Sequence, residues 1–123
     1  MLTLKIYQII TYIIRPLFFI FFSIRILNNK EEKGKFFERK GFSKNKKPAG
    51  TLIWIHAASV GETLSALPLI ERLVDFSSDY NILLTTGTKT SKNLISERNL
   101  KRVVHQYFPW DAKSYCDRFL NNW

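Results

Sequence analysis

Three short apolar runs in the second half of the chain constrain its fold most strongly. They span residues 51–57, 80–86 and 102–108. Runs of this length, rich in β-branched residues and bounded by turn residues, are typical of buried β-strands. Segments with apolar residues at helical spacing follow each run, over residues 62–76, 88–98 and 112–121. Because strands alternate with helices, we expect a parallel α/β sheet that forms one half of a Rossmann-like domain over residues 51–123.

Several single residues refine this prediction. Pro68 fits its helix only near the first turn and otherwise kinks it. Asp111 precedes the last helix and is predicted to be its N-cap. Trp54 is expected in the core, and His56 and His105 are expected to be structural residues at strand ends. The single cysteine, Cys116, excludes an internal disulfide and a cysteine-based zinc site.

The first 27 residues are strongly apolar and are predicted to form a membrane anchor helix. Two uncharged runs of nine residues flank Arg15. A spanning helix needs about 20 apolar residues, and a central arginine costs roughly 2.5–3.5 kcal/mol on insertion. Polar residues recur at helical spacing on one side of the first half, namely Lys5, Gln8, Tyr12 and Arg15. An in-plane amphipathic helix therefore stays open beside a span, and Pro16 is expected to kink or divide the helix.

Two other interpretations of this segment are less favoured. A cleaved signal peptide would end in small residues, whereas this stretch continues into lysine-rich sequence. A buried core helix would need a polar face, which the closely spaced phenylalanines of residues 18–22 do not leave.

Positive charge is concentrated in the first 50 residues. The chain has 19 Lys and Arg against 10 Asp and Glu, for a net charge of +9. Residues 1–29 carry +3, residues 30–50 carry +5 and residues 51–123 carry +1. Residues 28–50 are thus predicted to be a basic juxtamembrane linker, which places the rest of the chain in the cytoplasm by the positive-inside rule. Basic residues beside an apolar helix favour an anionic membrane surface over nucleic acid as the partner.

Two loops at the carboxyl ends of the first two predicted strands could bind a ligand. The first contains Ser59, Gly61 and Glu62, and the second contains Thr86, Gly87 and Thr88. Amides that open a helix bind anions, and ligands of parallel sheets lie at this edge. The simpler alternative is that Glu62 and the threonines only stabilise helix starts. The sequence has no phosphate-loop or metal-ligand pattern.

Long motifs in this chain resemble the bacterial 3-deoxy-D-manno-octulosonic acid (Kdo) transferases. They are Ile53–Leu64, Leu67–Ile70, Leu84–Ser91 and His105–Asp111, together with Glu38-Arg39, Gly41-Phe42 and the Arg15-Pro16 pair. The resemblance covers nearly the whole chain.

The resemblance implies a glycosyltransferase of lipopolysaccharide biosynthesis with the two-domain GT-B fold. Such enzymes move Kdo from CMP-Kdo to the lipid A precursor, lipid IVA, with inversion and without a metal or other cofactor. Glu62 matches the family's general base. From the predicted geometry of the two loops, rather than from the resemblance, we expect contacts with the acceptor at Ser59, Gly61, Thr86, Gly87 and Thr88. The expected location is the cytoplasmic face of the bacterial inner membrane.

The chain departs from the family in length. Family members are several times longer, and the CMP-Kdo domain would lie beyond residue 123. The expectation from sequence is therefore a fragment or a truncated relic that is inactive on its own. The alternative function is a non-catalytic, membrane-bound module that binds anionic lipid.

Overall fold

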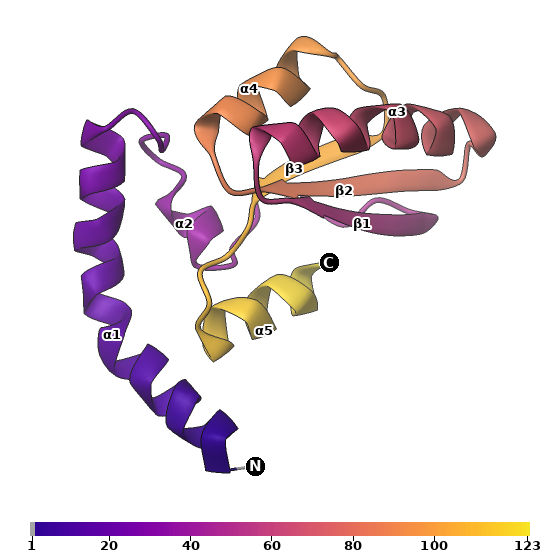
Figure 1. Cartoon of the computed structure of the whole chain (residues 1–123). Helices are drawn as coiled ribbons and strands as arrows, with labels where there is room; N and C mark the ends of the chain where they lie inside the picture. The colour runs from indigo at the N-terminus through magenta and orange to yellow at the C-terminus, as the bar shows by residue number, and fades with distance from the viewer. Residues whose placement is uncertain (1) are drawn as a thin grey trace. The chain divides into compact units, whose positions relative to one another are not determined.

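The computed structural model describes residues 2–123 as two compact units. One unit comprises residues 2–43 and 109–123, and the other comprises residues 44–108. The first contains α1 (Leu2–Leu27), α2 (Phe36–Arg39) and α5 (Lys113–Asn122); the second contains β1 (Thr51–Ala57), α3 (Val60–Phe76), β2 (Tyr80–Thr86), α4 (Lys89–Glu97) and β3 (Val103–Tyr107) (Figure 1). The structure thus groups residues 109–123 with the N-terminal part, whereas we expected them to belong to the α/β domain.

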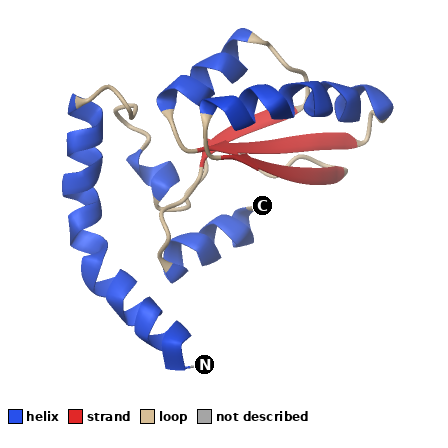
Figure 2. Cartoon of the chain, in the orientation of Figure 1, coloured by secondary structure: helices blue, strands red, loops and turns tan. Residues whose placement is uncertain are grey.

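The second unit is a parallel α/β layer, as predicted. Its strands lie in the order β1-β2-β3, and both strand pairs are parallel. Helices α3 and α4 lie on one face of this sheet (Figure 2). After each strand, the following helix returns the chain to the end of the sheet where the strands begin. The carboxyl ends of all three strands therefore lie at the opposite edge.

Burial in the sheet follows the position of each strand. β2 pairs with both neighbours, and its residues 82–86 are all buried, as an uninterrupted apolar run predicts. The core between the sheet and the helices consists of Ala57, Ile70, Val74, Ile82, Leu84 and Ile95. β1 lies at an edge of the described sheet, and its side chains point alternately to the two faces. Ile53 and Ile55 therefore pack against this core.

The expectation that Trp54 is a core residue is wrong. Its side chain points to the other face of β1 and is 46% exposed. The indole Nε1 donates a hydrogen bond to Thr85 Oγ1 at 2.9 Å, and the ring stacks on Phe108 with centroids 6.3 Å apart. The apolar run of β1 concealed the period-2 alternation of a strand with one buried face.

The helices of this unit begin close to their predicted positions. Helix α3 starts at Val60, two residues before the prediction, because Ser59 caps it. Pro68 lies in the interior of α3 rather than in its first turn. Helix α4 is capped by Thr88, whose hydroxyl accepts a hydrogen bond from the Ser91 amide.

Helix α1 is the longest element of the first unit and continues through Pro16 for 26 residues. Its axis changes direction partway along its length (Figure 1), as a proline without an amide hydrogen would produce. Among residues 2–123, α1 is the one helix that could cross a membrane by length and composition.

Aromatic rings join α1 to the segment before α5. Trp110 has four phenylalanine rings within 6.4 Å, centroid to centroid: Phe18, Phe21, Phe22 and Phe36. Phe22, on α1, is buried in this cluster. Such tilted and edge-on ring pairs contribute roughly 0.5–1.5 kcal/mol each beyond the burial of their area.

Residues 28–50, which we predicted to be a linker, contain the short helix α2 and two buried charged side chains. Glu31 and Arg39 are only 3% and 4% exposed. Glu31 Oε1 accepts hydrogen bonds from Arg39 Nη2 at 2.6 Å and from Arg25 Nε at 2.8 Å. One buried carboxylate therefore ties the end of α1 to α2.

Helix α5 contacts the turn that follows α2. Gly41 has φ +81°, and a Cβ at this position would collide with the Tyr115 carbonyl oxygen. Arg118 Nη1 donates to the Lys40 carbonyl at 2.6 Å. The prediction that Asp111 caps α5 is wrong, because the N-cap is Ala112 and Asp111 accepts a hydrogen bond from the Tyr7 hydroxyl.

Candidate functional site

Two loops meet at the carboxyl edge of the sheet. The last residue of β1, Ala57, is in register with Thr86, the last residue of β2. A Cβ built on Gly87 would lie 2.9 Å from the Ala58 carbonyl oxygen. Glycine therefore permits the loop before α4 to approach the loop before α3. The two loops therefore lie side by side, and their use as one ligand site stays a prediction.

Glu62 takes part in a reciprocal cap at the start of α3. The Glu62 amide donates to Ser59 Oγ at 3.2 Å, and Glu62 Oε2 accepts from the Ala58 amide at 2.8 Å. This pair resembles a capping box in which the carboxylate bonds to the amide one residue before the N-cap. The simpler interpretation of Glu62 as a helix-stabilising residue therefore has structural support.

The same geometry leaves the Glu62 carboxylate accessible. Its residue is exposed, and the backbone hydrogen bond fixes its position at the helix start. A Cβ on the neighbouring Gly61 would meet no described atom within 4 Å. The first turn of α3 thus offers a held carboxylate beside open space, an arrangement that a general base for a bound hydroxyl requires.

The threonines of the second loop are turned inward. Thr86 is completely buried, and its Oγ1 lies 2.9 Å from His105 Nε2. Thr88 Oγ1 caps α4 and lies 2.9 Å from Ser91 Oγ. Their expected contacts with an acceptor remain predictions; from the buried Thr86, such a contact would have to use the backbone.

A polar and aromatic cluster on the open face of β1 escaped the sequence interpretation. His56 is exposed near the end of β1, and its Nδ1 lies 3.0 Å from Thr85 Oγ1. The Phe108 ring lies 4.3 Å from the imidazole, centroid to centroid. The sequence could have indicated this cluster, because Trp54 and His56 are two residues apart in a strand and therefore point to the same face of the sheet.

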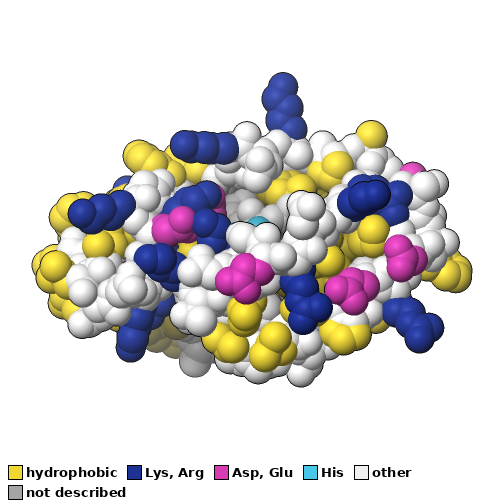
Figure 3. Space-filling model, turned by 90° about the horizontal axis from the view of Figure 1, so that it is seen from above, with side chains coloured by type: hydrophobic (Ala, Val, Ile, Leu, Met, Phe, Trp, Pro, Cys, Tyr) yellow, Lys and Arg dark blue, Asp and Glu magenta, His cyan; other side chains and the backbone are white. Residues whose placement is uncertain are grey.

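Charged side chains of both signs lie on the surface of the chain. On the face drawn in Figure 3, lysine and arginine side chains are interspersed with acidic ones. Among residues 2–123, no group of three or more His, Cys, Asp or Glu side chains is arranged to hold a metal ion.

Fold and site together define a parallel α/β protein whose candidate site lies where the loops after β1 and β2 meet. The sequence model of the family described as 3-Deoxy-D-manno-octulosonic-acid transferase (kdotransferase) matches residues 34–123. The chain therefore belongs to the Kdo transferase family. No solved structure matches the chain.

Individual relatives agree with the family model. The chain is 33% identical over 120 residues to the 3-deoxy-D-manno-octulosonic acid transferase of Rickettsia bellii, which covers 98% of the chain and 29% of that protein. It is 32% identical over 116 residues to the protein of the same name from Haemophilus influenzae, covering 94% of the chain and 27% of that protein. The chain thus spans less than a third of the length of these curated relatives.

Proposed function

We propose that the natural polypeptide containing this chain transfers Kdo from CMP-Kdo to lipid IVA in lipopolysaccharide biosynthesis, within a GT-B fold. In this proposal residues 1–123 supply the acceptor side of the enzyme. The observation that carries it is the match of residues 34–123 to the family, with Glu62 exposed where two loops meet.

Glu62 is the proposed general base. It takes the proton of an acceptor sugar hydroxyl as that oxygen attacks the anomeric carbon of Kdo. The new carbon–oxygen bond forms while the bond to the CMP phosphate oxygen breaks, so configuration inverts and CMP leaves. The capping hydrogen bond from Ala58 occupies Glu62 Oε2 and holds the carboxylate for in-line proton transfer.

The neighbouring residues have proposed supporting roles. Ser59 fixes the start of α3 through its bond with the Glu62 amide. Gly61 leaves room for the acceptor, and Gly87 lets the second loop lie against the first. Thr86 and Thr88 hold that second loop through their bonds to His105 and Ser91. The reaction as proposed uses no metal or other cofactor.

Helix α1 is the proposed membrane anchor, lying in the plane of the interface. Contacts with residues 110–115 extend along one side of α1, through Phe18, Phe22 and Arg15. Helix α5 carries Lys113 and Asp117 beside this side of α1. A spanning α1 would draw these charges into hydrocarbon at roughly 2.5–3.5 kcal/mol each. An in-plane helix buries its exposed apolar side and leaves them in water.

The transfer proposal is tested with the natural polypeptide that contains residues 1–123. Purified protein, lipid IVA and CMP-Kdo are incubated, and the lipid is analysed by mass spectrometry. We expect a product heavier by one or more Kdo units, formed at the same rate in EDTA. A lipid of unchanged mass would contradict the transfer, and loss of activity in EDTA would contradict the metal-free mechanism.

The anchor is tested by labelling single cysteines with a membrane-impermeant maleimide in sealed inner-membrane vesicles. The variants Leu2→Cys and Lys101→Cys are made in a Cys116→Ser background. An in-plane α1 predicts that both cysteines are labelled in inside-out vesicles and neither in right-side-out vesicles. Labelling of position 2 in right-side-out vesicles would show a span.

A further inference from the structure

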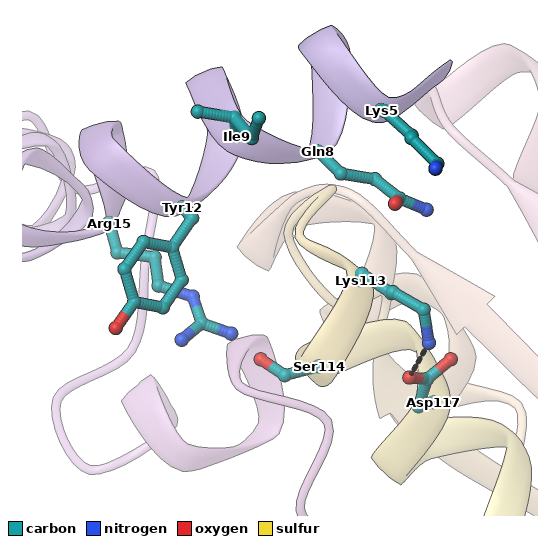
Figure 4. A pocket seen from close by; sticks show the side chains of 8 residues that line it. All are labelled: Lys5, Gln8, Ile9, Tyr12, Arg15, Lys113, Ser114 and Asp117. Atoms are coloured by element: carbon teal, nitrogen blue, oxygen red, sulfur yellow. Dashed lines mark hydrogen bonds and ion pairs between the residues drawn. The ribbon is translucent and has the colours of Figure 1, made fainter. Parts of the chain in front are cut away.

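The polar side of α1 lines a cavity with the first turns of α5, within one compact unit (Figure 4). The cavity has a volume of about 550 Å³. Lys5 and Arg15 come from α1, while Lys113, Ser114 and Asp117 come from α5. The four polar positions that the sequence places on one side of α1 all line this cavity.

The cavity carries an excess of positive charge. Three cationic side chains line it against one carboxylate, and that carboxylate is already paired with Lys113 at 2.5 Å. Arg15 lies over the rings of Tyr12 and Tyr115, at 4.9 and 5.0 Å from their centroids. Lys5 and Arg15 are therefore the cations available to an incoming anion.

Two buried polar atoms on the wall of this cavity have no hydrogen-bond partner. They are Arg15 Nε and Ser114 Oγ. Buried donors without partners are rare and costly, at roughly 1–3 kcal/mol each. Figure 4 shows the Arg15 guanidinium directed toward Ser114. An acceptor between α1 and α5 would satisfy both donors, and an oxyanion is the acceptor that matches the charge.

We propose that this cavity binds the phosphate group of an anionic membrane lipid. A guanidinium and a hydroxyl group together supply the directed donors that a phosphate accepts. The proposal extends the in-plane anchoring of α1 and is independent of Kdo transfer.

An apolar groove on the next turns of α1 favours a lipid over free phosphate. It measures about 330 Å³ and is lined by Ile14, Leu17, Phe18, Phe21 and Trp110. The groove follows the charged cavity along the same helix. A molecule with a phosphate head group and an acyl chain could therefore occupy the cavity and the groove together. Burial of the acyl chain in the apolar groove adds to the affinity of a lipid, whereas inorganic phosphate lacks this contribution.

The test uses monomeric short-chain lipids, so binding does not depend on a bilayer. The natural polypeptide containing this chain, in a non-ionic detergent, is titrated by calorimetry with dihexanoyl phosphatidic acid, dihexanoyl phosphatidylcholine and inorganic phosphate. We expect phosphatidic acid to bind at least tenfold more tightly than the other two. Phosphatidylcholine binding with equal affinity would overturn the anion site, and equal affinity for inorganic phosphate would overturn the lipid assignment.

Matched variants locate the site. Arg15→Gln is expected to weaken phosphatidic acid binding at least tenfold, and Lys5→Gln at least threefold, because each removes a cation of the cavity. Lys101→Gln makes the same change of charge on the second unit and is expected to stay within twofold of the unchanged protein. Lys5 is exposed, so its replacement leaves the fold intact even if Arg15→Gln unfolds the unit. Unchanged binding by Lys5→Gln, or an equal loss with Lys101→Gln, would overturn the proposal.

Discussion

The two units of this chain differ in the interactions that stabilise each of them internally. The second unit has backbone hydrogen bonds between parallel strands and a core of aliphatic side chains. The first unit has three helices and relies on specific side-chain contacts: rings around Trp110, the buried carboxylate of Glu31 and the close approach at Gly41.

This difference determines how each unit responds to substitution. An aliphatic core distributes its free energy over many interchangeable contacts, and a single change removes one share of it. A buried ion cluster concentrates free energy in a few groups, because removing one partner leaves the others charged and unpaired. The first unit should therefore be the more fragile of the two.

The largest effect is expected for Glu31→Gln. The substitution leaves Arg39 buried without its counter-ion, which we expect to cost about 3–5 kcal/mol of unfolding free energy. Ile82→Ala, at about 2–5 kcal/mol, is the matched change in the aliphatic core. Hydrogen exchange should show Glu31→Gln loosening residues 109–123 while β2 stays protected, and Ile82→Ala doing the reverse. Equal loosening of both units by either variant would break the comparison.

Gly41→Ala should destabilise the first unit by about 3 kcal/mol. Its positive φ strains any other residue, and the new methyl group meets the Tyr115 backbone. The control is Gly61→Ala, in the first turn of α3, where a Cβ meets no described atom within 4 Å. Urea unfolding followed by circular dichroism should leave this control within about 1 kcal/mol of the unchanged chain. Similar losses for both glycines would refute the packing role of Gly41.

The caps of the second unit should have smaller effects. Ser59→Ala and Thr88→Ala each remove one hydrogen bond to a helix amide, which costs about 1 kcal/mol. Urea unfolding measures both losses, and Ser59→Thr, which keeps a hydroxyl at the cap, should recover most of the first. A loss above that expected for Glu31→Gln would reverse the proposed order of the two units.

The smallest effect concerns the reactivity of Cys116 rather than stability. Burial raises the pKa of the Cys116 thiol above its usual range, and the nearby Asp111 carboxylate adds to the shift. At pH 7.5 the thiolate is thus scarcer than in a free cysteine. We expect slower reaction with a disulfide reagent than for Lys101→Cys in a Cys116→Ser background. The rates should converge in urea, and equal rates in the folded protein would contradict the burial of the thiol.

The second unit could be predicted from sequence because its signals are local. Two strands begin and end where the apolar runs do, and the third, Val103–Tyr107, is one residue shorter at each end. The early start of α3 was also predictable, since Ser59 and Glu62 have the spacing of a capping box. Trp54 was misassigned because an edge strand and a central strand can carry similar apolar runs.

The first unit could not be predicted in this way, because its contacts join residues far apart in sequence. Gly41 meets Tyr115, and Trp110 meets Phe22. No periodicity relates such pairs, so residues 28–50 resembled a linker and Asp111 resembled a cap. At the candidate site, Glu62 and the two loops were predictable from their places after β1 and β2, but the inward turn of Thr86 depends on His105, on a third strand.

The most direct test of the account is the transfer rate of the Glu62→Gln variant. Glutamine can accept the Ala58 hydrogen bond but cannot take a proton, so the cap persists and the base is lost. Glu71→Gln changes an exposed glutamate of the same helix and is the control. In the natural polypeptide with lipid IVA and CMP-Kdo, we expect kcat to fall about 10²–10⁴-fold for Glu62→Gln and to stay within about twofold for Glu71→Gln. A Glu62→Gln enzyme as active as the control would contradict the central claim.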